Sequence, residues 1–186
     1  MVTLFYKPPE HVEVDGKRYR LKPSFDRVLE TFDVFTRDWP DADKIDYSCW
    51  LLIHGRPRDK AAALNAAYDV LIEPRKADGQ KCFDFIQDAP LIYAAFMQAY
   101  GIDLFEQRIH WWKFITLLNA LPSDTRFVEV VNIRTKPLPT PTKHNQKEIE
   151  NLLRAKAKVG LVMSQEERER QFKDGLAKIA QAFITG

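Results

Sequence analysis

Four side chains near the middle of the chain are of the types that perform general acid–base catalysis. Asp84 and Asp88 precede an aromatic segment, residues 91–121, and Asp103 and His110 lie within it. A carboxylate near an imidazole can move a proton to or from a substrate. Each of them also suits a structural role. Asp88 and Asp103 precede expected helices, where a carboxylate caps free N–H groups, and His110 can fill a polar gap between packed helices. We favour the structural interpretation.

The other residues that carry chemistry form no recognised catalytic or metal-binding motif. The four histidines lie in separate parts of the chain, whereas metal sites need clustered ligands. Cys49 and Cys82 are far apart in sequence, so neither a disulfide framework nor a zinc site is encoded locally. The seven glycines form no phosphate-binding loop, and nucleophile and metalloprotease motifs are missing. We therefore expect no enzyme activity, no catalytic residue, no metal and no cofactor.

Charge and hydropathy restrict the partners that the chain can have. Lys and Arg number 28 against 26 Asp and Glu, and the resulting net charge of +2 is too small to indicate a nucleic-acid partner. A membrane-spanning helix needs about 20 apolar residues. Asp103, Glu106, Arg108 and Lys113 interrupt the apolar segment 91–121. We therefore expect neither a nucleic-acid partner nor a membrane partner.

A β-hairpin is predicted near the N-terminus. Residues 12–21 alternate apolar and polar side chains around Asp15-Gly16, and an Asp-Gly pair between alternating runs is a strong hairpin signal. A lone hairpin is marginally stable in water, so its apolar side must pack on helices.

Three helices should follow the hairpin. The first, residues 25–35, has Ser24 as its N-cap and is closed by Pro40. Its apolar side chains recur at the helical spacings of three and four: Phe25, Val28, Leu29, Phe32 and Phe35. Residues 41–55 and 56–74 form the other two, because a glycine and two prolines bound them.

Gly101 divides the aromatic segment 91–121 into two further helices. Pro90 lies in the opening turn of the first, and the second follows Asp103 and carries Trp111 and Trp112. Adjacent helical positions point about 100° apart. One tryptophan should therefore enter the core, and the other should face a partner helix or a second copy of the chain.

Residues 126–134 suit either a helix or a strand, and we favour a helix. Three prolines then make residues 136–145 a stiff, exposed linker. The predicted organisation is a helical domain with its N-terminal hairpin at 1–135, the linker at 136–145, and a helical C-terminal tail at 146–186. The fold class is mainly α.

The tail contains two predicted helices, and the second of them starts with a capping box. Ser164 is followed three residues later by Glu167. An apolar stripe lies further along: Phe172, Leu176, Ile179 and Phe183. Because an isolated helix of this length is marginal in water, we expect the stripe to be ordered only when docked. It can dock back onto the helical domain or onto a neighbouring copy of the chain, and we favour the neighbouring copy.

The sequence FDFIQDAPLIYAAFMQAYGIDLFEQRIHWWKFITLLNALPSDTRFVEVVNIR, residues 83–134, also carries a family resemblance. The aspartate before IYAAF, the YGIDL break, the HWW helix and the closing IR together resemble a bacteriophage protein family. That family is encoded among the tail genes of long-tailed phages and prophages and is regarded as a tail assembly chaperone.

The resemblance implies a non-catalytic role in phage tail assembly. The expected partners are the tape-measure protein, the tail tube protein and further copies of the chain. The protein would act in the host cytoplasm and be absent from the mature virion. The alternative is a structural connector or terminator that stays in the virion. The hypothesised partner-binding residues are Tyr100, Trp111, Trp112, Phe172, Leu176, Ile179 and Phe183.

Overall fold

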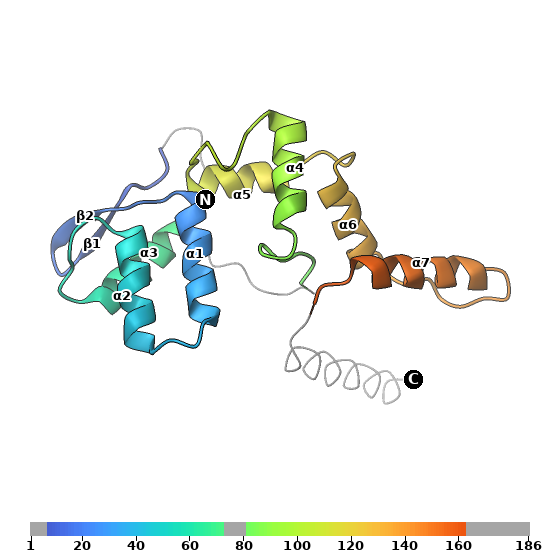
Figure 1. Cartoon of the computed structure of the whole chain (residues 1–186), viewed down its shortest axis with the longest axis horizontal. Coiled ribbons are helices and arrows are strands. Elements are labelled where there is room, and N and C mark those ends of the chain that lie inside the picture. Colours follow the sequence, from blue (N-terminus) through green and yellow to red (C-terminus); the bar gives the residue numbers. More distant parts are fainter. Residues whose placement is uncertain (1–6, 73–80, 163–186) are drawn as a thin grey trace. The chain divides into compact units, whose positions relative to one another are not determined.

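The computed structural model describes residues 7–72 and 81–162, and these residues form seven helices and one two-stranded hairpin (Figure 1). In chain order the elements are β1 (His11–Val14), β2 (Lys17–Arg20), α1 (Phe25–Thr36), α2 (Asp41–Leu52), α3 (Lys60–Leu71), α4 (Ala89–Tyr100), α5 (Trp111–Asn119), α6 (Arg126–Thr135) and α7 (Gln146–Val159). The predicted class, mainly α with an N-terminal hairpin and a helix in the C-terminal part, is confirmed.

The described residues divide into two compact units. The first comprises residues 7–72 and 89–129, and the second comprises residues 81–88 and 130–162. The predicted division at the proline-rich linker stays a prediction.

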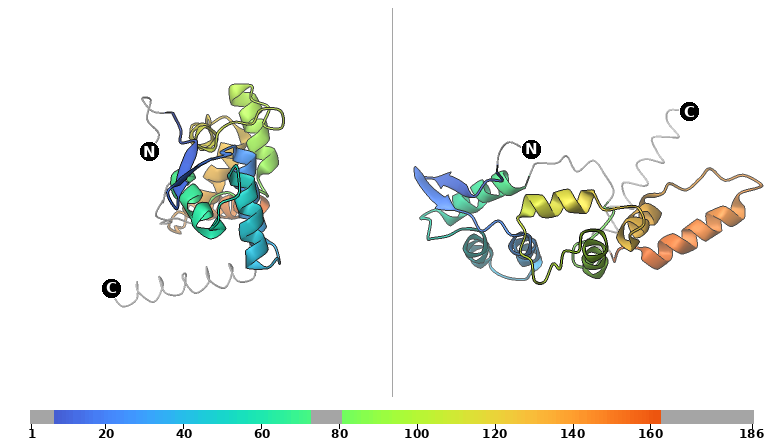
Figure 2. Two further views of the ribbon diagram at one scale, coloured as in Figure 1. Left: turned by 90° about the vertical axis from the view of Figure 1, so that its left-hand side faces the viewer. Right: turned by 90° about the horizontal axis from the view of Figure 1, so that it is seen from above.

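The predicted hairpin is present, and the Asp-Gly pair forms its turn. Asp15 has φ 50° and Gly16 has φ 69°, the left-handed conformation that a two-residue type I′ turn requires. Strand β1 pairs antiparallel with β2, with Val14 opposite Lys17. Val12 and Val14 are buried, and α3 packs against β1 (Figure 2). The hairpin is therefore stabilised by a helix, as expected for a sheet of two strands.

Helix α1 has its predicted start, but its ends are built differently from the prediction. Ser24 lies at the N-cap position without a side-chain capping bond. Pro40 was wrongly predicted to close the helix. The backbone leaves helical geometry at Arg37, whose N–H donates to the carbonyl of Val34, and Pro40 instead leads into α2. A residue before a proline avoids helical geometry. Helix α1 therefore cannot continue directly into α2, and a short non-helical segment separates the two.

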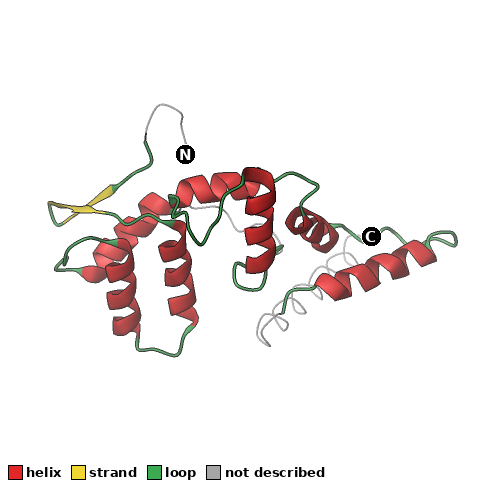
Figure 3. Cartoon of the chain, turned by 45° about the horizontal axis from the view of Figure 1, so that its top comes forward, coloured by secondary structure: helices red, strands yellow, loops and turns green. Residues whose placement is uncertain are grey.

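Helices α2 and α3 are both shorter than predicted. Ile53 is extended and pairs with Leu21 next to the hairpin, which ends α2 at Leu52. Helix α3 starts after Asp59, whose carboxylate accepts the N–H of Ala62 at 2.9 Å. Helix α2 packs on both α1 and α3 (Figure 3).

Phe114 is the centre of the aromatic core of the first unit. Its ring stacks on Phe25 of α1 at 4.7 Å between centroids and on Phe96 of α4 at 5.2 Å. Trp111, one turn earlier in α5, stacks on the same ring at 5.8 Å. Helix α1 thus shares one aromatic cluster with α4 and α5, which are far from it in sequence. Within residues 91–121, the buried aromatic side chains Phe96, Trp111 and Phe114 therefore belong to the core.

A buried ion pair organises the second unit. The guanidinium of Arg134 donates to both carboxylate oxygens of Asp88, at 2.6 and 2.9 Å, and the two side chains are only 8% and 3% exposed. Arg134 also donates to the carbonyls of Cys82 at 3.2 Å and Val159 at 2.5 Å. One side chain therefore joins the segment 81–88, the end of α6 and the end of α7.

Further hydrogen bonds hold the end of α7 in the second unit. Lys156 donates to the backbone carbonyl of Arg134 at 2.6 Å. The side-chain amide of Gln87 donates to the carbonyl of Gly160 at 3.0 Å and accepts the N–H of Val162 at 2.7 Å. The helix predictions for 126–134 and for the start of the tail are confirmed, whereas the capping box and the stripe from Phe172 to Phe183 lie outside the described residues.

We expect Asp88→Ala to lower the free energy of unfolding by about 3–5 kcal/mol, because it leaves the Arg134 guanidinium buried without its counter-charge. Glu129→Ala is the matched control. It removes an exposed 2.7 Å ion pair with Arg126 and should cost less than about 1 kcal/mol. Urea denaturation measures both, and equal losses would contradict the role given to the buried pair.

Candidate partner-binding site

The four acid–base candidates are each engaged in local structural contacts. Asp88 binds Arg134. Asp84 accepts the N–H groups of Ile86 and Gln87 at 2.8 and 2.9 Å. Burial by itself would raise the pKa of Asp84, but hydrogen bonds from Lys81 and from these two N–H groups outweigh it and lower the pKa.

Asp103 and His110 have structural partners as well, but His110 takes the role that was predicted for Asp103. Asp103 accepts the N–H of Phe105 and the hydroxyl of Tyr93, at 2.9 and 3.2 Å. Helix α5 begins only at Trp111, and Nδ1 of His110 caps it by accepting the N–H of Trp112 at 3.0 Å. Asp103 therefore caps a turn in the segment that precedes α5.

Backbone pairing explains the late start of α5. The N–H of Phe25 donates to the carbonyl of Ile109 at 3.0 Å, and the N–H of Trp111 donates to the carbonyl of Pro23 at 2.7 Å. These bonds pair Ser24 with His110 as an antiparallel bridge. Residues in such a bridge are extended, so the helix cannot begin before it.

The three described candidates for partner binding all have contacts inside the chain. Trp111 is 6% exposed and belongs to the core. Trp112 is half-buried, and its indole N–H donates to the carbonyl of Leu71 at 2.8 Å. The hydroxyl of Tyr100 donates to the carbonyl of Leu117 at 2.9 Å. The two tryptophans thus face different surroundings, and a partner-binding role stays a prediction. The four tail candidates lie outside the described residues.

An apolar groove, which the sequence analysis missed, lies between α1, α2 and α3. Its volume is about 650 Å³. The residues that line it are Phe32, Phe35, Ile45, Ala61, Leu64, Asn65, Tyr68, Asp69 and Ile72. Phe32 and Phe35 are 36% and 44% exposed, although they share the helical spacing of the buried Phe25 and Val28. The spacing of Phe32 and Phe35 is that of residues facing a core. Only the packing of the neighbouring helices shows that no other element fills the space beside these two rings.

The groove has the chemistry of a helix-binding surface. Its α3 wall presents side chains at spacings of three and four, which form one continuous face. Asp69 is the one charged residue in the lining. Tyr68 is half-buried there, and burial raises its pKa. Such a groove can accept the apolar face of an amphipathic helix.

A second exposed surface is an aromatic ladder formed by Trp39, Tyr47 and Trp50. The Tyr47 ring lies 5.8 Å from Trp39 and 5.6 Å from Trp50. Arg37 lies over Trp39 at 5.0 Å, and Lys22 lies over Trp50 at 5.3 Å. Tryptophan, tyrosine and arginine are the residue types that dominate binding energy at protein interfaces.

The described residues contain no group of three or more His, Cys, Asp or Glu that could hold a metal ion. None of the helices described is long and apolar enough to cross a membrane. The family described as Bacteriophage Gp15 protein matches residues 7–161. The chain belongs to this family. For this Gp15-family chain, neither the curated proteins nor the solved structures contain a match.

The family match confirms the resemblance to a bacteriophage protein family and extends it well beyond residues 83–134. It covers the groove of the first unit and both partners of the Asp88–Arg134 pair. All seven described helices of this Gp15-family chain lie inside the matched residues.

The two tryptophans should respond differently to substitution. We expect Trp111→Ala to lower the free energy of unfolding by about 3–5 kcal/mol, because it empties part of the aromatic core. Trp112→Phe keeps a ring but removes the bond to the Leu71 carbonyl, which should cost about 1 kcal/mol. Urea denaturation of both variants tests this, and a larger loss for Trp112→Phe would overturn it.

The His110 cap should make stability depend on pH. Burial lowers the pKa of His110 below its ordinary value of 6.5, and its Nδ1 must be unprotonated to accept the N–H of Trp112. Because the unfolded chain binds the proton more readily, this stability is present above about pH 6.5 and is lost as pH falls through the lowered pKa.

Replacing His110 by asparagine isolates this effect. Asparagine is a good N-cap that does not titrate, so His110→Asn should show a smaller loss of stability between pH 7 and pH 5 than the wild type. Urea denaturation across this range measures the difference. The pKa of His54 is also lowered, but it contributes equally to both proteins. An identical pH dependence would exclude His110 as its source.

Proposed function

We propose that this protein is a tail assembly chaperone that binds the tape-measure protein and assists assembly of the tail tube without catalysis. The observation that supports this most directly is the apolar groove between α1, α2 and α3. Phe32 and Phe35 are large apolar side chains that remain exposed there. Membership of a bacteriophage protein family is consistent with this role.

The groove suits the task of protecting a long helical chain. Before the tube polymerises around it, a tape-measure protein exposes apolar faces that would otherwise associate with one another. A groove of this kind buries such a face without forming covalent bonds. The chaperone would leave when tube subunits compete for the same apolar face.

A non-catalytic role agrees with the state of the candidate acid–base side chains. Asp88 is neutralised by a buried arginine, and the hydrogen-bonding capacity of His110 is used at a helix cap and toward the Pro9 carbonyl. Asp84 and Asp103 accept backbone N–H groups in turns. The proposal therefore includes no cofactor. In the proposed role, the protein acts in the host cytoplasm during assembly and is not part of the finished virion.

The second candidate function is a structural connector or terminator in the tail. The aromatic ladder of Trp39, Tyr47 and Trp50 favours it, because it is an additional exposed surface built from residues typical of lasting interfaces. Mass spectrometry of purified virions separates the candidates. A chaperone is absent from the particles, and a structural component is present in a fixed ratio to the other tail proteins.

We expect Phe35→Glu to abolish co-purification with co-expressed tape-measure fragments, because it places a charge in the apolar groove. Phe105→Glu is the matched control, since Phe105 is 82% exposed and does not line the groove. It should leave co-purification intact. Thermal melts establish that both variants fold. Retention of the fragments by folded Phe35→Glu would refute binding in the groove.

A further inference from the structure

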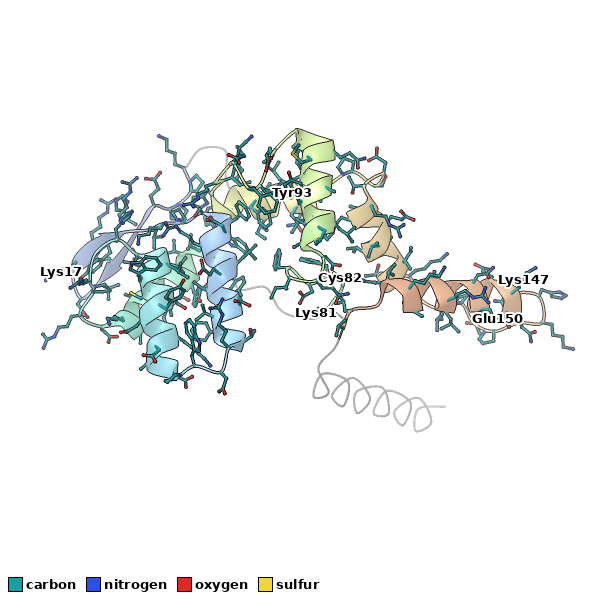
Figure 4. All side chains as sticks on the ribbon, viewed as in Figure 1. Lys17, Lys81, Cys82, Tyr93, Lys147 and Glu150 are labelled. Atoms are coloured by element: carbon teal, nitrogen blue, oxygen red, sulfur yellow. The ribbon has the colours of Figure 1, made fainter. Side chains whose placement is uncertain are left out.

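Helix α2 connects two regions of opposite charge in the first unit. Before and at its N-terminus lies the acidic corner, residues 38–43, which reads DWPDAD. Beyond its C-terminus lies the basic hollow, with a volume of about 930 Å³. The residues that line the hollow are Asp15, Lys17, Tyr19, Arg56, Arg58, Asp59 and Lys60. Lys17 lies at the turn end of the hairpin (Figure 4).

The basic hollow has positive charge that the described part of the chain does not neutralise. Lys60 is paired with Asp46 at 2.5 Å, and the Asp59 carboxylate is used to cap α3. Lys17, Arg56 and Arg58 form no ion pair with another described residue. The hollow can therefore accept carboxylates from elsewhere.

Further positive charge lies close to His54, which is two residues before Arg56 in the sequence. After burial, which is the larger cause, the charges of Lys22, Arg20 and Arg27 lower the pKa of the neighbouring His54. A site with an excess of one sign of charge attracts a partner of the opposite sign and orients it during approach.

The acidic corner has the complementary chemistry. Asp38 and Asp43 form no ion pair with another described residue, and Asp41 is 92% exposed with Lys44 at 3.7 Å as its neighbour. Trp39 lies among these carboxylates and is exposed. Its ring is held by Arg37 and Tyr47. The corner thus presents an ordered aromatic side chain surrounded by acids.

These two regions cannot bind each other within one molecule. They lie at opposite ends of α2, which has 12 residues, and a helix of that length is about 18 Å long. Both regions belong to the first unit and are separated by a rigid element. Their complementarity can be satisfied only between molecules.

We propose that the acidic corner of one copy of this protein docks into the basic hollow of a second copy. The contact joins two different surfaces, so each bound copy still offers a free corner or a free hollow. Such a heterologous contact produces a ring if its rotation closes and a filament if it does not. The proposal concerns a surface separate from the apolar groove and does not depend on the function proposed above.

The composition of the hollow favours a protein segment over nucleic acid as its occupant. Two acidic residues, Asp15 and Asp59, offset part of the charge of the four basic residues in the lining, whereas a nucleic-acid strand is bound by a strongly basic patch. Tyr19 is the one aromatic residue there and is half-buried, whereas strand binding uses several exposed rings. A compact loop with a few carboxylates and an aromatic side chain fits better.

Reciprocal charge reversal tests the proposal with the full chain. One variant carries Arg56→Asp and Arg58→Asp in the hollow, and the other carries Asp38→Lys and Asp43→Lys in the corner. Light scattering at low salt should show oligomers for the wild type and monomers for each variant alone. An equimolar mixture should regain oligomers, because each corner again meets a hollow of opposite charge. Misfolded variants cannot produce this recovery.

Arg108→Asp with Lys113→Asp is the control, because it changes the net charge by the same amount as the hollow variant but lies outside both regions. It should oligomerise like the wild type. High salt should dissociate the wild type, since exposed charges are screened, whereas an apolar contact through Phe172 and Phe183 would persist. A monomeric wild type, association that survives high salt, or a mixture that stays monomeric would overturn the proposal. Tighter binding of single-stranded DNA than of the peptide DWPDAD would overturn it as well.

Discussion

The ion pair between Arg134 and Asp88 is the constraint on which the second unit depends. That unit has few buried apolar side chains, and α7 contributes none of them. Its segments are instead joined by the Arg134 guanidinium, which also binds the carbonyls of Cys82 and Val159. A charge buried to this extent is tolerable only when every donor has a partner. The pair therefore specifies which segments meet.

The first unit is held by a different principle, the packing of aromatic rings around Phe114. Because α1, α4 and α5 all supply side chains to this cluster, the rest of α1 and the face of α3 are free to form a groove. The groove and the aromatic ladder are therefore surfaces of a rigid scaffold. Such surfaces are consistent with the proposed role, in which the protein binds an apolar helix of another chain.

Local patterns predicted the elements well where one local interaction decides the backbone. The Asp-Gly turn and the helical spacing of α1 belong to this class. Predictions were wrong where distant segments compete for the backbone. Helix α2 ends early because Ile53 pairs with Leu21, and α5 starts late because His110 pairs with Ser24.

The sequence by itself determined the mainly helical class, the hairpin and the resemblance to a phage family, because these follow from periodicity and from short motifs. It also contained Asp88 and Arg134, which belong to two separate motifs of that resemblance. Only the tertiary structure decided that these two residues form one buried pair and that Phe32 and Phe35 face an open groove. The physical reason is that burial depends on what packs above a side chain. Spacing along one helix shows which residues share a face but not whether another element covers it.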